Sequence, residues 1–380
     1  MASTPAQQIA VAIAPKFTAT LSIFGSGALC YLGYLNLRNS SGGNKRTPPT
    51  YHRLLIGMSA CDLSASTAWF FTTWPIPRGT PGVFGALGTQ QTCTAQAFFA
   101  QFSLSAVMYN AALAVYYFLV IVREWSGADI LRIEPCFHLH AIAWGLGTAV
   151  ASLALTLFNQ VGWDCWISAS PLGCKESWKN NGITTCTRGD NGSLYQWAFY
   201  YAPLWAVLIL VTSLMYSVYW TVKQQEKKMR QYRLGADVTT ATNECNRSRK
   251  IANQAMWYVG AFYASWIFPT IFQLVLVTNG NIYFPLLFLT AFSVPIQGFL
   301  NLLVYTHPKY LRYRSDYPNS LFILAWGRML WTELSGDTTS LRGSASTSER
   351  RSHRLNSTVT QKDQRGSNVA LSLGQNNSTV

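Results

Sequence analysis

Seven stretches of the chain are apolar over a length that can cross a lipid bilayer, and polar segments separate them. About 20 helical residues span the hydrocarbon of a membrane, so each stretch is predicted to form one transmembrane helix. The predicted spans are residues 17–37, 54–75, 95–122, 137–158, 198–222, 251–277 and 283–305.

The distribution of charged residues supports this prediction. Of the 380 residues, 49% are hydrophobic and only 12% are charged, whereas soluble domains carry about a quarter charged residues. All 29 Lys and Arg residues fall outside the predicted spans, and Asp62 is the only acidic residue inside one. We therefore expect an all-α membrane protein, a bundle of seven transmembrane helices.

The positive charges also predict the orientation of the bundle. The N-terminus and the second, fourth and sixth loops together hold 5 Lys and Arg, the first, third and fifth loops hold 14, and the C-terminal tail holds 10. Because positive residues stay on the cytoplasmic side, the N-terminus is expected outside and the C-terminus in the cytoplasm. The net charge of +14 then lies at the inner face, where it favours anionic membrane lipid over nucleic acid as a partner.

The chain outside the bundle is short on the outer side and long on the inner side. Residues 1–16 are expected to form a short extracellular N-terminus before the bundle at residues 17–305. Residues 306–334 form a juxtamembrane region, in which the apolar segment Leu321–Trp331 is too short to span and is predicted to lie as a helix in the inner interface. Residues 335–380 are rich in Ser and Thr without apolar periodicity, which is typical of a disordered cytoplasmic tail.

The tail carries two candidate signalling features. Ser352 and Ser357 lie beside arginines in RRSHRLNST, a pattern that suits phosphorylation, although tails of this composition often act only as linkers. The final residues Ser378-Thr379-Val380 match the pattern that adds as a strand to a PDZ domain. A three-residue match has low specificity.

The seventh span contains a row of polar residues. Gln297, Asn301 and Tyr305 recur every four residues in PIQGFLNLLVY, so they share one helical face. Asn301 lies about 10 Å and Asp62 about 12 Å from the inner ends of their spans, at 1.5 Å per residue. These depths place Asp62 and Asn301 in one layer, which we predict to be a switch layer, with Gln297 and Tyr305 as its further members on the same face of the seventh span. The alternative is that the amide and hydroxyl groups only hold helices together, as polar residues do in bilayers.

Proline lies within the last three spans. Pro203, Pro269 and Pro295 each remove a backbone hydrogen bond, and we predict them to be hinges. The alternative is the irregularity that is ordinary in membrane helices. Trp266 and Phe268, beside Pro269, either sense a ligand or pack in the core.

Several motifs together resemble those of G-protein-coupled receptors, most closely the cyclic-AMP-receptor-like group. These motifs are CDLSAS, AWG, DCWI, YYAPLW, QAMWYVGAFYASWIFPTI and PIQGFLNLLVY, in this order within residues 17–310. The resemblance implies a plasma-membrane receptor that converts ligand-driven helix movement into coupling to a heterotrimeric G protein. Asn301-x-x-x-Tyr305 then takes the place of the Asn-Pro-x-x-Tyr motif of rhodopsin-like receptors, with Leu302 where their proline stands.

The inner end of the third span departs from that pattern. The Asp-Arg-Tyr motif that ends the third helix of many such receptors is absent from this chain. Arg123 and Glu124 in VIVREW end the helix instead. Arg123 is therefore only a candidate contact for the G protein. Further candidates are the basic residues at the base of the sixth span, Arg247, Arg249 and Lys250.

The outer side carries four cysteines, for which three pairings exist. The resemblance favours a bridge between Cys93 and Cys165, which leaves Cys174 and Cys186 to pair within the second outer loop. Asn191, in the sequon Asn-Gly-Ser, is the candidate glycosylation site on this side.

No ligand class is predicted from the outer segments. Cyclic AMP is the best-known ligand of the group that the motifs resemble, and its anionic phosphate would favour Arg or Lys in the binding site. The few outer bases, however, are balanced by acids in the second outer loop. The outer bases are Lys16, Arg78, Lys175, Lys179 and Arg188. The candidate ligand contacts are Trp166, Tyr201, Trp266 and Phe268.

Other classes of seven-helix protein fit the sequence less well. A transporter or channel remains the alternative, but one buried Asp is a poor chain of ionisable groups. A retinal pump needs a Schiff-base lysine, and the predicted spans contain none. For a zinc hydrolase, the membrane-adjacent His138 and His140 stand at i,i+2 and point to different faces. We therefore expect no enzyme, cofactor or metal.

Overall fold

The computed structural model describes residues 4–40, 50–171, 174, 186–232, 238–280, 282–317 and 321–335. The chain divides into two compact units, Met1–His307 and Pro308–Val380. Each unit is described by itself below.

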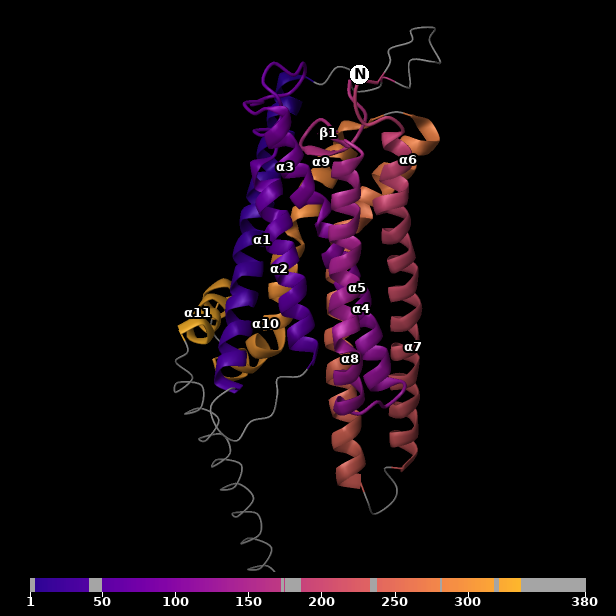
Figure 1. Cartoon of the computed structure of the whole chain (residues 1–380). Helices are drawn as coiled ribbons and strands as arrows, with labels where there is room; N and C mark the ends of the chain where they lie inside the picture. The colour runs from indigo at the N-terminus through magenta and orange to yellow at the C-terminus, as the bar shows by residue number, and fades with distance from the viewer. Residues whose placement is uncertain are drawn as a thin grey trace, which may run out of the picture. The chain divides into compact units, whose positions relative to one another are not determined.

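Seven helical segments of the described chain are long and apolar enough to cross a membrane (Figure 1). They are α1 (Pro5–Ser40), α2 (Thr50–Phe71), α3 (Gln90–Gln101) with α4 (Ser103–Ile121), α5 (Gly127–Ala154), α6 (Gly192–Gln196) with η2 (Trp197–Tyr201) and α7 (Ala202–Tyr232), α8 (Val238–Asn279), and α9 (Phe284–Ser293) with η3 (Val294–Ile296) and α10 (Gln297–Asp316). The predicted all-α bundle of seven spans is confirmed.

The helices and the apolar stretches do not share the same ends. α1 already begins at Pro5, and α10 continues through Pro308 to Asp316, because helical hydrogen bonding does not stop where polar residues begin. α2 ends before Pro75, where Thr72 takes a positive φ of 45°. Phe158, predicted to end the fourth span, belongs to a strand instead. The longer helices include charged residues that the predicted spans left out.

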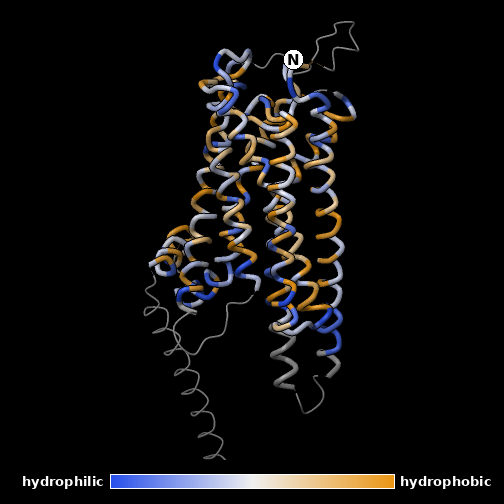
Figure 2. The backbone as a smooth tube through the Cα atoms, viewed as in Figure 1, coloured by the Kyte–Doolittle hydropathy of each residue, from blue (hydrophilic) through white to orange (hydrophobic). Residues whose placement is uncertain are grey.

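The outside of the bundle is apolar at mid-height. Ile209 is 69% exposed and Leu139 67% exposed, which would be unfavourable in water and suits lipid. Figure 2 shows apolar residues along the middle of the helices and polar residues at helix ends, most visibly at the inner end of α7. The term outer end is used here for the end that carries the two disulfides.

A small antiparallel hairpin covers the outer end. β1 (Phe158–Gln160) pairs with β2 (Cys165–Ile167), and Asn159 stands opposite Trp166 in the register. The hairpin packs on the start of α3 around a cluster of buried residues that are apolar or disulfide-bonded. The cluster consists of Ile76, Cys93, Ala97, Leu157, Phe158, Cys165 and Ile167.

The three prolines predicted as hinges lie in different kinds of backbone. Pro203 follows the π-helical turn η2, and Pro295 lies in the 3₁₀ turn η3, whereas Pro269 lies inside the continuous helix α8. Just after η3, the backbone N–H of Gly298 donates to Oγ of Ser22 on α1 at 3.0 Å. The seventh span is therefore irregular in its middle, and α1 supplies a hydrogen bond there.

The second unit contains the end of α10 and the helix α11 (Phe322–Ser335). Tyr310 packs with Ala325 and Met329, and Lys309 forms an ion pair with Glu333. Large apolar side chains on α11 and immediately before it are exposed. They include Leu321, Ile323 and Trp331, each more than 70% exposed.

Candidate functional site

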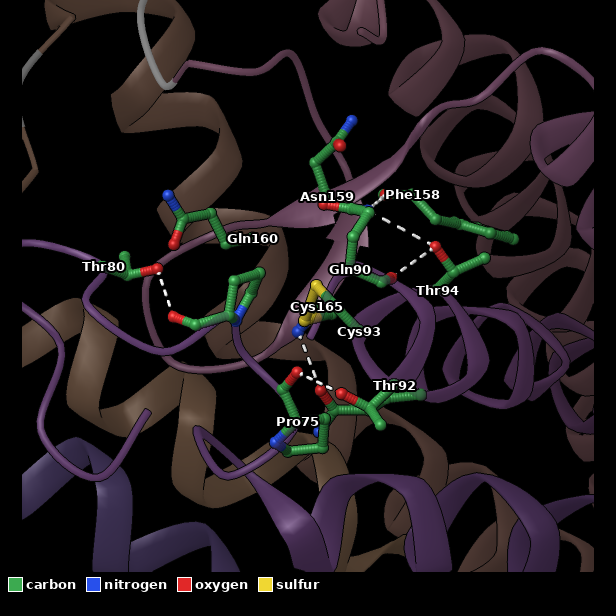
Figure 3. The surroundings of a disulfide bond; sticks show 12 residues. Pro75, Thr80, Gln90, Thr92, Cys93, Thr94, Phe158, Asn159, Gln160 and Cys165 are labelled. Carbon is green, nitrogen blue, oxygen red and sulfur yellow. Dashed lines mark hydrogen bonds between the residues drawn. A yellow bond between two sulfur atoms is a disulfide. The ribbon is translucent and has the colours of Figure 1, made fainter. Parts of the chain in front are cut away.

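A disulfide attaches the hairpin to α3 (Figure 3). Cys93 on α3 bonds to Cys165 on β2, with their Cα atoms 5.3 Å apart. Hydrogen bonds reinforce this link, because Gln90 Nε2 donates to the carbonyl of Phe158 at 2.9 Å and Gln96 Oε1 accepts from the backbone N–H of Cys165 at 3.1 Å. The residues after Cys165 are therefore held in a fixed position over the bundle.

The second outer disulfide joins Cys174 and Cys186, with their Cα atoms also 5.3 Å apart. Both pairs are those expected from the sequence and the resemblance. Asn191, the candidate glycosylation site, lies exposed in the left-handed region at the start of α6. Its position leaves room for a bulky glycan.

Trp166 links the hairpin to the helices. Its Nε1 donates to Gln101 Oε1 at the end of α3, at 2.7 Å. Its ring meets Tyr200 and Tyr201 of η2 edge-on, with ring centroids 5.1 and 5.7 Å away. π-Helical turns like η2 are frequent at functional sites, because they change which side chains point inward.

Tyr200 continues this contact into the bundle. Its hydroxyl lies 2.9 Å from Oγ of Ser103 on α4, and its ring centroid lies 5.7 Å from that of Trp266 on α8. Trp266 Nε1 in turn donates to Gln297 Oε1 at the start of α10, at 2.9 Å. The buried hydrogen bond between Trp266 and Gln297 joins the sixth and seventh spans directly.

One turn further inward, Asn301 meets Asp62. Asn301 Nδ2 donates to Asp62 Oδ2 at 3.0 Å, and both side chains are buried. The serines that flank Asp62 in the sequence do not bond to it: Ser66 donates to Ser22 at 2.9 Å, and Ser59 Oγ has no partner in the described part. Asp62 therefore links α2 to α10 through one amide.

The four predicted switch residues lie at three levels of the seventh span, and Asp62 and Asn301 share one of them. Gln297 bonds to Trp266, Asn301 to Asp62, and the Tyr305 hydroxyl accepts a 3.4 Å hydrogen bond from Asn36 on α1. The face of α10 contacts three different helices at three depths. We use the term relay for six residues from the hairpin inward, which are linked by side-chain contacts or, between Gln297 and Asn301, by one turn of α10: Trp166, Tyr200, Trp266, Gln297, Asn301 and Asp62.

Two residues around Trp166 and Trp266 were not predicted from the sequence, and one predicted ligand contact lies apart from them. Tyr200 stands beside the predicted Tyr201, and Gln101 is fully buried where only an apolar span was expected. Phe268, a predicted ligand contact, is half-buried and makes no ring contact with the described aromatic residues. Polar residues inside apolar spans, such as Gln101 and Ser103, were the available signal.

A second polar network lies at the inner end. Arg53 on α2 forms an ion pair with Glu134 on α5, which also accepts from Thr50 at 2.7 Å. His138 lies 3.7 Å from the same carboxylate and 2.9 Å from the hydroxyl of Tyr109. His140 turns away to its own helix, and the described residues contain no cluster that could hold a metal ion.

The predicted G-protein contacts are only partly described. Arg249 on α8 lies 3.4 Å from Glu226 on α7, and Lys250 and Arg123 are exposed. The side chain of Arg247 lies outside the described residues, as do Ser352, Ser357 and the C-terminal Ser378-Thr379-Val380. The pair of Glu226 and Arg249 connects the inner ends of the fifth and sixth spans.

Two outer charged residues are already engaged or enclosed by the protein. Lys16 Nζ donates to the carbonyls of Phe70 and Phe71 at the end of α2, both at 3.2 Å, and lies 3.7 Å from the ring centroid of Trp74. A cation is favourable at a helix C-terminus, so this lysine stabilises the fold. Asp164, before β2, is 3% exposed with no partner for its Oδ1, and burial raises the pKa of its carboxyl well above the ordinary range.

The chain is similar to known seven-helix proteins. No protein-family model matches it. Over 126 residues it is 30% identical to G-protein coupled receptor 157 of Mus musculus, a match that covers 30% of this chain and 34% of that receptor. The crystal structure of squid rhodopsin superposes with a TM-score of 0.57 at 15% identity, over 84% of this chain and 87% of that one. The chain is therefore a multi-pass membrane protein with the seven-helix fold of rhodopsin.

Proposed function

We propose that this protein is a G-protein-coupled receptor of the plasma membrane, which converts extracellular ligand binding into activation of a heterotrimeric G protein. The observation that carries the proposal is the relay. Side-chain contacts run from the hairpin at the outer end to Gln297, and one turn further along α10 Asn301 bonds to Asp62. The resemblance of its motifs to the cyclic-AMP-receptor-like group makes cyclic nucleotides the first ligands to test.

The outer part of the relay suits a ligand sensor. Trp166 is held by a disulfide-bonded strand, yet its ring contacts two tyrosines of an irregular turn in the fifth span. A ligand that repositions Trp166 or Tyr201 acts on Tyr200 and then on Trp266. Such a ligand shifts the receptor between states only if it binds them with different affinity.

The inner part of the relay suits a switch. Gln297 and Asn301 lie one turn apart on α10, directly after the irregular turn that contains Pro295. Displacing Trp266 breaks its hydrogen bond to Gln297 and permits α10 to rotate or bend at η3. That movement changes the hydrogen bond between Asn301 and Asp62, because Asn301 lies on α10 and Asp62 on α2.

A G protein then reads the inner ends of the fifth and sixth spans. Arg249 and Lys250 supply exposed positive charge there, and Arg123 supplies it at the inner end of the third span. The inner ends of α7 and α8 lie side by side (Figure 1), and Glu226 on α7 forms an ion pair with Arg249 on α8. Outward movement of α8 would separate this pair and free Arg249 for a partner.

The test is G-protein activation by relay variants in cells, screened with a ligand panel that includes cyclic nucleotides. Asp62→Asn keeps the shape of the side chain and removes its charge, and Gln297→Leu removes the acceptor for Trp266. We expect both variants to reach the cell surface and to change basal or ligand-stimulated activation. Ser265→Ala is the matched control, since Ser265 is buried beside Trp266 but bonds only within its own helix. Wild-type signalling by both relay variants would contradict the proposal.

The alternative function is a seven-helix transporter or channel. It requires buried ionisable groups that connect the two sides of the membrane. Asp62 and Glu134 are both buried, but each is bonded to a neighbouring helix. Ion currents or solute uptake by the purified protein in proteoliposomes, abolished by Asp62→Asn, would favour this alternative over a receptor.

A further inference from the structure

A groove of about 510 Å³ lies at the outer end of the bundle, where α3, α5 and the second outer loop meet. None of the residues of the relay lines this groove. Its lining includes Gln90, Gln91, Phe98, Phe99, Leu153 and Arg188. Its volume falls within the range of small-molecule sites, about 300–1,000 Å³.

The groove is polar at one end and apolar at the other. Along α3 the lining begins with Gln90, Gln91 and Thr94 and continues inward with Ala95, Phe98 and Phe99. At 1.5 Å per residue, the distance from Gln90 to Phe99 is about 13 Å. Phe99 is 50% exposed and Leu153 45% exposed, so the apolar end opens toward the lipid side of the bundle.

A fixed cation stands in the lining of the groove. Arg188 Nε donates to Asn159 Oδ1 at 3.3 Å, and backbone hydrogen bonds to Ser170 hold its loop. The guanidinium has five N–H groups, and the others have no partner among the described residues. No acidic side chain of the described chain pairs with Arg188. A cation held in this way attracts an anion, because the two remaining amino groups present a planar fork.

We propose that this groove binds a long-chain fatty acid from the outer leaflet, with its carboxylate on Arg188 and its alkyl chain along Phe98, Phe99 and Leu153. A single guanidinium balances the single charge of a carboxylate and can bond to both of its oxygens. A phosphate monoester carries nearly two charges and favours more than one cation. The order of the lining matches an amphiphile that enters from the membrane with its head toward water.

The occupied groove acts on the relay through the hairpin. Asn159, which holds Arg188, stands opposite Trp166 in the β-ladder, and Phe98 packs on the cluster around the disulfide. A bound carboxylate therefore influences the strand that positions Trp166. This modulation rests on the proposed receptor function, whereas binding to the groove does not.

Binding is tested on the purified full-length protein in nanodiscs with a photoreactive diazirine analogue of palmitate. We expect crosslinks on α3 and α5, mapped by peptide mass spectrometry. Unlabelled palmitate should compete for them, whereas hexadecanol, which has the same chain without the charge, should not. Arg188→Gln should weaken labelling at least about tenfold, the scale of a lost charge-assisted hydrogen-bond pair.

Two further variants separate the groove from general effects on the protein. Arg78→Gln removes the same charge from an exposed position on the same face, outside the groove, and should label normally. Leu153→Trp fills the apolar end while leaving Arg188 in place, and should also abolish labelling. Thermal unfolding of each variant checks that it is folded.

Three results would overturn the proposal. Equal labelling of wild type and Arg188→Gln would show that the cation does not bind the headgroup. Equal competition by hexadecanol would reduce the site to nonspecific lipid contact. Stronger competition by lysophosphatidic acid than by palmitate would show that the groove prefers a phosphate headgroup to a carboxylate. Because none of these readouts uses signalling, they stand apart from the test of receptor function.

Discussion

Glycines on α1 offer a sharp test of how the first and seventh spans pack. A Cβ atom on Gly25 would lie 2.6 Å from the carbonyl oxygen of Gly298 and 2.7 Å from Cα of Phe299. Both are backbone atoms, so no side-chain rotation can relieve the contact. A Cβ atom on Gly27, two residues later on the same helix, would meet nothing within 4 Å. Gly25→Ala and Gly27→Ala are thus the same change in two packing environments.

The size of the effect follows from the contacts that must change. To reach an ordinary separation of about 3.5 Å, α1 and the start of α10 must move apart by almost 1 Å, and overpacking of this kind costs about 1–3 kcal/mol. The same movement weakens the hydrogen bond from Gly298 to Ser22, 3.0 Å long, worth about 0.5–1.5 kcal/mol. We expect Gly25→Ala to lose about 2–4 kcal/mol. In membranes this loss matters, because close packing drives helix association there.

Thermal unfolding in one detergent measures this loss. At about 2 °C per kcal/mol for a protein of this size, Gly25→Ala should unfold roughly 4–8 °C below wild type, and Gly27→Ala within about 1 °C of it. A thiol-reactive dye can follow unfolding, since Cys61 on α2 is buried and reacts when the bundle opens, whereas the exposed Cys136 reacts beforehand and contributes only to the baseline. If both variants unfold at the wild-type temperature, the close approach of Gly25 to Gly298 does not exist in the protein.

Three further features of the structure are tested by substitution in the same thermal assay. Burial raises the folded-state pKa of Asp164 above its ordinary value near 4, so its ionisation costs stability as the pH rises above about 4. Asp164→Asn should therefore stabilise the protein at pH 7.5, with a gain that shrinks as the pH falls to 4; a gain independent of pH would exclude this cause. Lys16→Met should cost about 1–3 kcal/mol by uncapping α2, and Lys16→Arg should cost less. Arg53→Gln leaves Glu134 buried without its ion pair and should cost about 3–5 kcal/mol. Adding Glu134→Gln should recover most of that loss, and failure to recover would mean that the pair contributes little.

The sequence predicts the seven spans because hydropathy is a property of each segment on its own. A helix satisfies the hydrogen bonds of its own backbone and can therefore cross lipid, and about 20 apolar residues are enough to span the hydrocarbon. The rise per residue also places Asp62 and Asn301 at similar depths, and the structure joins them by a 3.0 Å hydrogen bond. Depth along a helix is thus available from residue numbers alone.

The partners around each helix are decided only by packing. Gln297 and Tyr305 share a face with Asn301, but they bond to α8 and α1 because those helices stand beside α10 at those depths. Tyr200 joins the relay through a π-helical turn that shifts the inward face of the fifth span, and no hydropathy pattern records that shift. Arg53, Glu134 and Lys16 lie outside the predicted apolar spans. The structure nevertheless places them in helices, because α1, α2 and α5 continue past their apolar stretches.

Packing between distant segments also determines the structure of the outer end. The sequence leaves three pairings for four cysteines, and the hairpin brings Cys165 onto Cys93 at a separation of 72 residues. Arg188 and Phe99 lie 89 residues apart in the sequence and share one groove only after the second outer loop folds over α3. The sequence sets the composition and depth of each helix, whereas rotation about the helix axis and the choice of neighbour depend on the tertiary fold, because they arise from contacts between segments that are distant along the chain.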